Sequence, residues 1–300
     1  MNNSSASPHG TFEAVPIRQV SFGQDIRRRF QRNRLALAGT GIVALLCFCA
    51  AFAPLIAPYD PVHVDLDHQF MPPSARYPFG TDFYGRDLLS RVIFGARISL
   101  LIGLIPSAIS MIIGSVLGVL SAFYSGWLDT LIMRVADVVL AFPSIILAMV
   151  VTYTLGASLF TLFIALSVVG WAGAARVVRS QALSLKERDF IIACRAVGVG
   201  NGRIMLRHII PNCIAPILVL LTLNIPQAIM AEAGLSFLGV GAQPPTPSWG
   251  LMVNEAQQYL FSAPWASILP GLAILLTVLG FNFVGDGLRD AIDPYLKGKM

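Results

Sequence analysis

Few residues in this chain have the types and spacing that catalysis or metal binding requires. The sequence contains no Gly-x-x-x-x-Gly-Lys-Ser/Thr loop to hold phosphates, so we expect no ATP binding of the P-loop kind. It contains no His-Glu-x-x-His motif and no Ser/His or paired-Asp arrangement that would suit an intramembrane protease. None of the four histidines has metal-ligand spacing with cysteines or acids: His9, His63, His68 and His208. Only His63 and His68, which both lie on the expected outer segment, leave a weak metal site open. We therefore predict no catalytic, no cofactor-binding and no metal-binding residue.

One polar stretch, from Asp189 to Asn212, is suited instead to contact with another protein. It is basic, rich in glycine and set between long apolar segments. Its first half predicts a helix from about Phe190 to Val197, capped by Asp189, with an apolar stripe at helical spacing: Phe190, Ile191, Cys194 and Val197. Gly198 is expected to end this helix in the left-handed conformation that glycine adopts most easily.

The second half of the stretch predicts another short helix, from Arg203 to Ile210, that stops at Pro211. A helix, a glycine elbow and a second helix would thus carry an exposed apolar stripe at a membrane surface. This arrangement indicates a docking surface for a protein partner.

The same stretch resembles the cytoplasmic EAA loop of binding-protein-dependent ABC importer permeases. That pattern reads Glu-Ala-Ala, three residues, Gly, nine residues, then Ile-x-Leu-Pro. Four residues are in register with this pattern: Ala193, Gly198, Ile210 (for Leu) and Pro211. Three residues depart from it, because Ile192 replaces the Glu, Cys194 the second Ala and His208 the first Ile. The resemblance implies a surface for a cytoplasmic ATPase, to which we assign Asp189, Ala193, Arg195, Gly198 and Pro211.

Three further strings resemble the C-type subunit of the dipeptide/oligopeptide branch of these importers. They are Gly-Thr-Asp-x-x-Gly-Arg-Asp from Gly80, Gln-Pro-Pro-x-Pro-x-Trp-Gly from Gln243, and the ending from Gly285 to Pro294. With them the resemblance covers about Arg27 to Lys297. Asp82 and Asp87 in the first string have the wrong spacing for an EF-hand calcium loop, so we expect a tight turn and a helix cap there.

Composition places the chain in a membrane. It is 55% hydrophobic and only 12% charged, and the charges are segregated. Four runs carry no charge and are long enough for the ~20 residues of a membrane-spanning helix: 98–128, 138–175, 209–231 and 256–285. The net charge of +5 does not indicate a nucleic-acid partner, because the basic residues are spread along the chain rather than gathered on one soluble face.

These runs predict an all-α membrane protein with six transmembrane helices, of the type I ABC importer permease fold that the resemblance implies. Residues 1–34 would be a cytoplasmic tail, 35–57 an uncleaved first transmembrane helix and 58–97 an extracytoplasmic segment with a surface helix from Asp87 to Arg97. Residues 98–290 would form a five-helix core with a coupling loop at 181–212, and 291–300 a second cytoplasmic tail. The run 138–175 is too long for one span and should fold back at Gly156-Ala157-Ser158.

The distribution of Lys and Arg supports this topology. On it, 17 of the 21 basic residues lie inside and four lie outside: Arg76, Arg86, Arg91 and Arg97. Because cytoplasmic segments carry an excess of Lys and Arg, both termini are expected on the cytoplasmic side of a bacterial inner membrane.

The function expected from the resemblance is that of a permease subunit in an ATP-driven importer of di- or oligopeptides, with glutathione or nickel as other solutes of the branch. It implies four kinds of partner: a second, B-type permease, two cytoplasmic ATPases, an extracytoplasmic solute-binding protein and membrane lipid. The alternative is a secondary transporter or channel without ATPase subunits. Such proteins usually bury ionisable groups at mid-membrane, whereas Glu232 and Asp137 are expected near helix ends, facing a polar rim.

Overall fold

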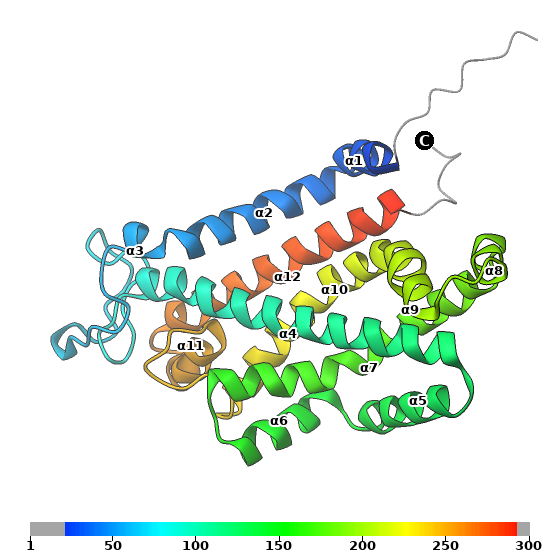
Figure 1. Cartoon of the computed structure of the whole chain (residues 1–300). Coiled ribbons are helices and arrows are strands. Elements are labelled where there is room, and N and C mark those ends of the chain that lie inside the picture. Colours follow the sequence, from blue (N-terminus) through cyan, green and yellow to red (C-terminus); the bar gives the residue numbers. More distant parts are fainter. Residues whose placement is uncertain (1–21, 293–300) are drawn as a thin grey trace, which may run out of the picture.

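The computed structural model describes residues 22–292, and these fold into an elongated bundle of helices (Figure 1). The expected terminal tails, with Asp293 and Pro294, lie largely outside the described residues. In chain order the α-helices are α1 (Phe22–Arg32), α2 (Arg34–Ala51), α3 (Ala53–Ile56), α4 (Leu88–Tyr124), α5 (Gly126–Ala141), α6 (Ser144–Leu155), α7 (Leu159–Lys186), α8 (Asp189–Ala196), α9 (Asn201–Ile204), α10 (Ile210–Phe237), α11 (Trp249–Ala256) and α12 (Pro264–Ile292). Two 3-10 turns, η1 (Leu66–His68) and η3 (Gln257–Tyr259), and a π-helical turn, η2 (Met205–Ile209), complete the described helices.

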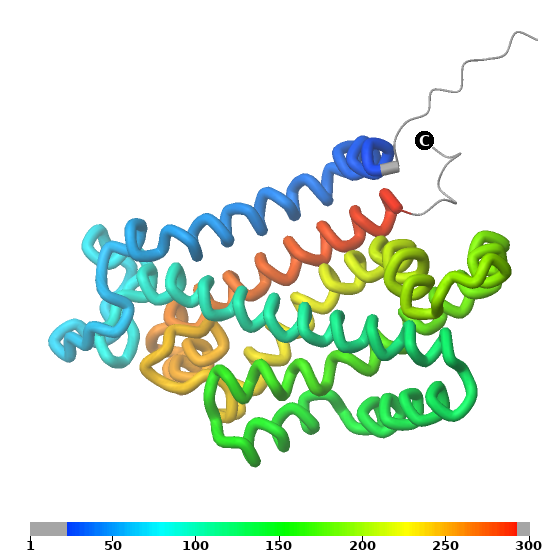
Figure 2. The backbone as a smooth tube through the Cα atoms, viewed as in Figure 1, coloured from blue at the N-terminus to red at the C-terminus, as the bar shows by residue number. Residues whose placement is uncertain are grey.

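Five of these helical segments are long and apolar enough to cross a membrane: α2, α4, α7, the continuous helical segment 201–237 and α12. A sixth span exists if α5 and α6, which are bent by 93° at a short break, count as one. The all-α membrane fold expected from the sequence is therefore confirmed for the described residues. The tube in Figure 2 separates two ends of the bundle, which we name the α8 end, where α1 also lies, and the α11 end.

The second span differs from the prediction. α4 is one helix of 37 residues, about 55 Å long, so the expected separate surface helix from Asp87 to Arg97 is its first part. Asp87 starts it as the N-cap, with Oδ2 accepting from the Ser90 backbone N–H at 2.8 Å. No helix breaker follows before Pro106, which the helix accommodates internally. The expected cap at Asp87 is confirmed.

The third span is broken. α5 includes Asp129, Arg134 and Asp137, the charged residues between the charge-free runs 98–128 and 138–175. α5 ends before Phe142 and Pro143, and Pro143 has no N–H with which to continue a helix. The fold-back expected at residues 156–158 is confirmed: Gly156 has φ +88°, and Ser158 and Thr161 form a capping box at the start of α7.

The remaining ends also extend beyond the predictions. α1 is helical from Phe22, within the tail expected over residues 1–34. Asn33 then caps α2 by accepting hydrogen bonds from Leu35 N and Ala36 N, both at 3.1 Å. α12 continues to Ile292, beyond the charge-free run 256–285. The segment between α10 and α12 contains α11.

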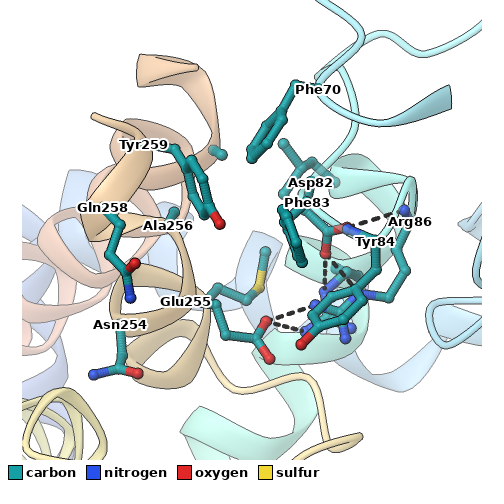
Figure 3. A pocket seen from close by; sticks show the side chains of 14 residues that line it. Phe70, Asp82, Phe83, Tyr84, Arg86, Asn254, Glu255, Ala256, Gln258 and Tyr259 are labelled. Carbon is teal, nitrogen blue, oxygen red and sulfur yellow. Dashed lines mark hydrogen bonds and ion pairs between the residues drawn. The ribbon is translucent and has the colours of Figure 1, made fainter. Parts of the chain in front are cut away.

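A charged cluster fixes the segment 58–87 to α11 (Figure 3). Arg86 donates to Asp82 Oδ2 from Nε and to Glu255 Oε2 from Nη2, both at 2.6 Å. Arg91, fully buried near the start of α4, donates from Nη2 to the same Glu255 oxygen at 3.3 Å. Removing one partner of such a buried pair typically costs about 3–5 kcal/mol, because the other charge is left unpaired. Loss of any one of these charges would therefore destabilise the α11 end.

The centre of the bundle is the contact between α4 and α7, which run side by side (Figure 1). Gly114 and Gly118 on α4 allow this approach: a Cβ at Gly114 would lie 2.6 Å from Ala174 Cβ, and one at Gly118 would lie 2.6 Å from the Ala175 carbonyl oxygen. Small residues permit such close packing in membranes, where no hydrophobic driving force acts between helices.

We predict that Gly114→Ala destabilises the chain, because its methyl group would meet the Trp171 carbonyl oxygen at 2.7 Å and push α4 from α7. Overpacking of this kind costs ~1–3 kcal/mol. Gly173→Ala on α7 is the matched control, since nothing lies within 4 Å of its Cβ position. Thermal unfolding of the purified chain in detergent should show a lower midpoint for Gly114→Ala and an unchanged or higher midpoint for Gly173→Ala. Equal midpoints would contradict the close contact.

Candidate coupling surface

Helix α8 begins one residue earlier than the sequence suggested. Its N-cap is Arg188, with an extended backbone (φ −75°, ψ 144°), and no side chain caps the helix. The prediction that Asp189 is the cap was therefore wrong: it is the first helical residue, because the Arg188 carbonyl already accepts from Ile192 N at 3.1 Å. The Asp189 carboxylate still lies in the first turn, where the helix dipole favours a negative charge.

The elbow at Gly198 has the predicted geometry. Gly198 has φ +78°, in the left-handed region. Its N–H donates to the Arg195 carbonyl and the Val199 N–H donates to the Cys194 carbonyl, both at 3.0 Å. These two bonds make a Schellman motif, which ends a helix by satisfying its free carbonyls. Nothing lies within 4 Å of a Cβ placed at Gly198, so conformation alone requires glycine here.

The segment after the elbow is continuous, and the prediction that Pro211 ends a short helix was wrong. α9, η2 and α10 follow one another from Asn201 to Phe237 without a break. In the π-helical turn the Ile210 N–H donates to the Met205 carbonyl, five residues back. Pro211 then stands in the first turn of α10, where its missing N–H costs least. The wider turn is where the helix adapts to proline.

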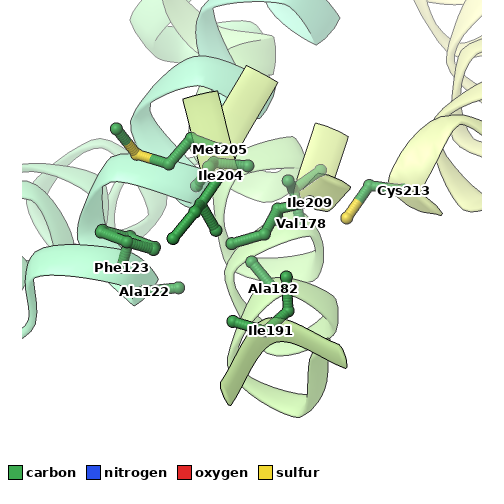
Figure 4. Packing of buried hydrophobic residues seen from close by; sticks show 10 residues of the cluster. Ala122, Phe123, Val178, Ala182, Ile191, Ile204, Met205, Ile209 and Cys213 are labelled. Carbon is green, nitrogen blue, oxygen red and sulfur yellow. The ribbon is translucent and has the colours of Figure 1, made fainter. Parts of the chain in front are cut away.

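The apolar stripe of α8 divides between two environments. Ile191 is fully buried, whereas Phe190 is 43% and Val197 78% exposed. Ile191 belongs to a cluster of buried side chains from α4, α7, α8, α9, η2 and α10, shown in Figure 4. Its members are Val119, Ala122, Phe123, Val178, Ala182, Ile191, Ile204, Met205, Ile209 and Cys213. We call it the junction cluster. Burying a side chain such as Ile contributes ~1.5–3 kcal/mol, and an eight-residue helix needs such contacts to be stable.

Polar contacts tie the same elements to the end of α4. Lys186, the last residue of α7, donates from Nζ to the Ala122 carbonyl at 3.0 Å and to Ser125 Oγ at 2.8 Å. The Arg195 guanidinium of α8 lies 5.1 Å from the centroid of the Phe123 ring. Both cations thus reach the C-terminal end of a helix, where positive charge is favourable. A displacement of α8 would therefore act directly on α4 through the contact between Arg195 and Phe123.

Two ion pairs join α5 to α7. Arg179 holds Asp129 with two hydrogen bonds of 2.6 Å, and Ser121 of α4 also donates to Asp129. Asp137 pairs with Arg134 of the same helix at 3.7 Å and with Arg176 at 2.5 Å. The pairs between helices have no local sequence signal, because their members lie 39 and 50 residues apart.

The structure brings four of the five predicted coupling residues together. Asp189, Ala193 and Arg195 lie on α8 and Gly198 directly follows it, all with exposed side chains or backbone. We call this exposed side of α8 and its elbow the candidate coupling surface. Pro211 is also exposed but belongs to α10. Sequence reasoning missed Lys186 and the junction cluster, since nothing local marks them as contacts of α8.

Two other expectations concern ionisable groups. Glu232 was placed at a polar rim, but its side chain is 1% exposed and accepts a hydrogen bond from Ser236 Oγ at 2.7 Å. That prediction was wrong, because α10 continues past it to Phe237. His68 lies outside the spans and contacts Asp65 at 2.8 Å, a hydrogen bond that lowers the pKa of Asp65. Between residues 22 and 292 no group of three or more His, Cys, Asp or Glu side chains could hold a metal ion.

Comparisons with known proteins agree with this architecture. Residues 114–298 match the family model described as binding-protein-dependent transport system inner membrane component, and residues 21–73 match the N-terminal TM domain of oligopeptide transport permease C.

Several curated relatives align along almost the whole chain. The dipeptide transport system permease protein DppC of Alkalihalophilus pseudofirmus is 43% identical over 93% of this chain and 91% of the relative. The di/tripeptide transport system permease protein DppC of Pseudomonas aeruginosa is 44% identical over 99% and 98%. The glutathione transport system permease protein GsiD of Escherichia coli O157:H7 is 46% identical over 90% of each chain.

A family model that covers more than half of the chain, together with near-full-length relatives above 40% identity, leaves one conclusion. It agrees with the membrane-spanning helices and with the fold expected from the sequence. The chain belongs to the family of inner membrane components of binding-protein-dependent transport systems, as a permease subunit of an ABC importer.

Proposed function

We propose that this permease subunit forms half of a translocation pathway for short peptides, driven by ATPases that dock on the candidate coupling surface. The observation that carries the proposal is α8 itself: a short helix with exposed Phe190 and Val197 that is anchored to the bundle through Ile191. An exposed apolar patch on a helix of this kind suits a protein partner. The peptide solute is inferred from relatives named for dipeptides, di/tripeptides and glutathione.

The partners follow from the same proposal. A second permease would complete the pathway, two ATPases would bind at the α8 end, and a solute-binding protein would dock at the α11 end. The α8 end would be cytoplasmic, with both termini on that side of a bacterial inner membrane. Arg27, Arg28 and Arg32, on the helix before the first span, agree with this orientation, because Lys and Arg are retained inside.

Transport would require no covalent chemistry in this chain. Closure of the ATPases would displace α8, and the junction cluster would carry that displacement to α4, α7 and α10 together. Because packed interfaces switch between discrete arrangements rather than deform smoothly, a small displacement of α8 can favour another arrangement of the spans. The ion pairs between α5 and α7 would hold one of these arrangements.

A secondary transporter without ATPases is the competing function, and Glu232 is the observation that favours it, since it is buried within a span. Buried carboxyl groups often serve ion coupling in such proteins. Here, however, Glu232 is hydrogen-bonded to Ser236, whose hydroxyl also accepts from Ala242 N at 3.0 Å. The carboxyl therefore fixes the loop after α10, which supports a structural role.

Cysteine labelling tests the orientation. In a variant without native cysteines, Ser74→Cys and Ser262→Cys at the α11 end are exposed and should react with a membrane-impermeant thiol reagent added to intact cells. Asn201→Cys at the α8 end, also exposed, should react only after the membrane is opened. Labelling of Asn201→Cys from outside would reverse the proposed topology.

Nucleotide binding tests the division of labour. The purified chain alone should neither bind nor hydrolyse ATP, because its sequence has no phosphate-binding loop. The complex with its ATPases should hydrolyse ATP, and loaded binding protein should stimulate it. Saturable ATP binding by the isolated chain, measured by calorimetry, would exclude the proposal.

Gly198→Val tests the coupling surface. A side chain with Cβ costs ~1–2 kcal/mol in the left-handed conformation, which corresponds to roughly a ten-fold loss in the population of the native elbow. The quantity that changes about ten-fold is the equilibrium constant between the native elbow and its alternatives, and we expect peptide uptake by the reconstituted complex to fall by up to that factor at unchanged expression and membrane insertion.

Gly200→Val is the matched control. Gly200 lies two residues away with φ −62° and ψ 144°, a conformation that valine adopts easily, and nothing lies within 4 Å of its Cβ position. Peptide uptake and stimulated ATP hydrolysis by the Gly200→Val complex should equal those of the parent complex. If Gly198→Val were equally active, the elbow would be a mere connector and the coupling surface would be misplaced.

A further inference from the structure

A cavity of about 110 Å³ lies within the spans, away from the coupling surface and from the charged cluster at the α11 end. Its lining comes from four elements: α4, the start of α6, α7 and α10. Five lining side chains carry uncharged hydrogen-bonding groups: Ser107, Ser110, Ser144, Asn224 and Gln227. No lining residue is ionisable. A cavity of this size accommodates several water molecules, or part of a larger polar molecule.

The polar groups of this cavity are largely without partners. Within residues 22–292, the side chains of Ser107, Asn224 and Gln227 make no hydrogen bond. Ser107 is only 4% exposed, and its hydroxyl still makes no hydrogen bond within the described residues. Leaving an amide or hydroxyl unsatisfied in hydrocarbon costs several kcal/mol. Contact of these side chains with lipid tails would therefore be unfavourable, whereas water or a polar group would satisfy them.

Helical spacing shows that the cavity is a continuous wall and not a set of scattered residues. On α10 the lining residues Asn224, Gln227, Ala228 and Ala231 follow the i, i+3, i+4, i+7 pattern of one face. On α4, Ser107 and Ser110 share a face beside Pro106. A Cβ at Gly170 of α7 would lie 2.5 Å from Ser110 Oγ, so glycine there leaves room for this hydroxyl.

The break between α5 and α6 provides a second, independent observation. Ser144 follows the 93° bend, and no side chain caps α6. The last carbonyls of α5 and the first N–H groups of α6 therefore lack partners within their helices. At membrane depth, non-helical backbone is tolerated only where protein buries it or where it lines a water-filled space. The bend lies beside the cavity, because Ser144, which directly follows the break, is one of its lining residues.

We propose that this cavity is a binding site for the amide groups of a solute in transit, lined by hydroxyl and carboxamide groups that donate and accept hydrogen bonds. The inference rests on the proposed function and adds to it the chemistry that is recognised. Serine, asparagine and glutamine match the N–H and C=O groups that every peptide carries. Because no charged group lines the cavity, it would accept peptides irrespective of the charge of their side chains.

Accessibility is the first test, in the complete complex reconstituted without native cysteines. Gln227→Cys should react with a small hydrophilic thiol reagent, and the tripeptide Ala-Ala-Ala, supplied with its binding protein and ATP, should slow the reaction. Leu218→Cys is the control: it lies nine residues away on α10, on the opposite face, and is also exposed. It should react slowly, with no effect of the tripeptide.

Two results would overturn the inference. Labelling of Gln227→Cys in the isolated chain but not in the complex would mean that the second permease covers this wall. Absence of labelling in both would mean that the residue faces lipid. In either case, uptake of Ala-Ala-Ala by the cysteine-free parent complex leaves the proposed function intact, whereas a parent that hydrolyses ATP but imports no peptide disproves that function.

Recognition of the amide group is the second test. Gln227→Leu removes the carboxamide at an exposed position, so the packing inside the chain is kept. Uptake of Ala-Ala-Ala is compared with that of its analogue N-methylated at the central amide, using the same binding protein. One hydrogen bond contributes ~1 kcal/mol, so we expect the preference for the unmethylated peptide to fall about five-fold in Gln227→Leu and not in Leu218→Ala. An unchanged preference in Gln227→Leu would show that the cavity does not read amides.

Discussion

The close contact of α4 with α7 is the constraint on which the rest of the molecule depends. Gly114 and Gly118 remove the side chains that would keep the helices apart, and α7 presents Ala174 and Ala175 in return. Membrane helices gain little from excluding water, so such direct backbone approach must supply the packing. The junction cluster then builds on this pair, because five of its ten members come from α4 or α7, at the end of the contact or beyond it: Val119, Ala122, Phe123, Val178 and Ala182.

This arrangement explains how a short surface helix can act on the whole bundle. α8 alone is too short to be stable in water, and it is held by Ile191 beneath it, by Arg195 on Phe123 and by the Schellman motif at Gly198. The contacts of Ile191 and Arg195 lead to the ends of α4 and α7 rather than to a loop. The exposed side of α8 is therefore backed by rigid elements, as force transmission between subunits requires.

Different polar chemistry serves different depths of the molecule. At the α11 end, Asp82, Arg86, Arg91 and Glu255 form a buried charged cluster that fixes the outer segment. Near the α8 end, Arg179 and Asp129 join two helices. Between them the described cavity contains hydroxyl and carboxamide groups without charge. Charge is expensive in the apolar interior, which agrees with the neutral hydrogen-bonding groups that line this cavity.

The sequence by itself determined the membrane class, the all-α fold, the fold-back at residues 156–158 and the left-handed Gly198, because charge-free runs and glycine act through local physics. Asp87 was recognised as a cap for the same reason. Only the tertiary structure decided that a continuous helical segment accommodates Pro211 after a π-helical turn, that Glu232 is buried and that α5 contains Asp129 and Asp137. It also paired Arg179 with Asp129 and gathered Ser107, Ser144 and Gln227 around one cavity. These features depend on contacts between residues far apart in the chain, for which no local pattern exists.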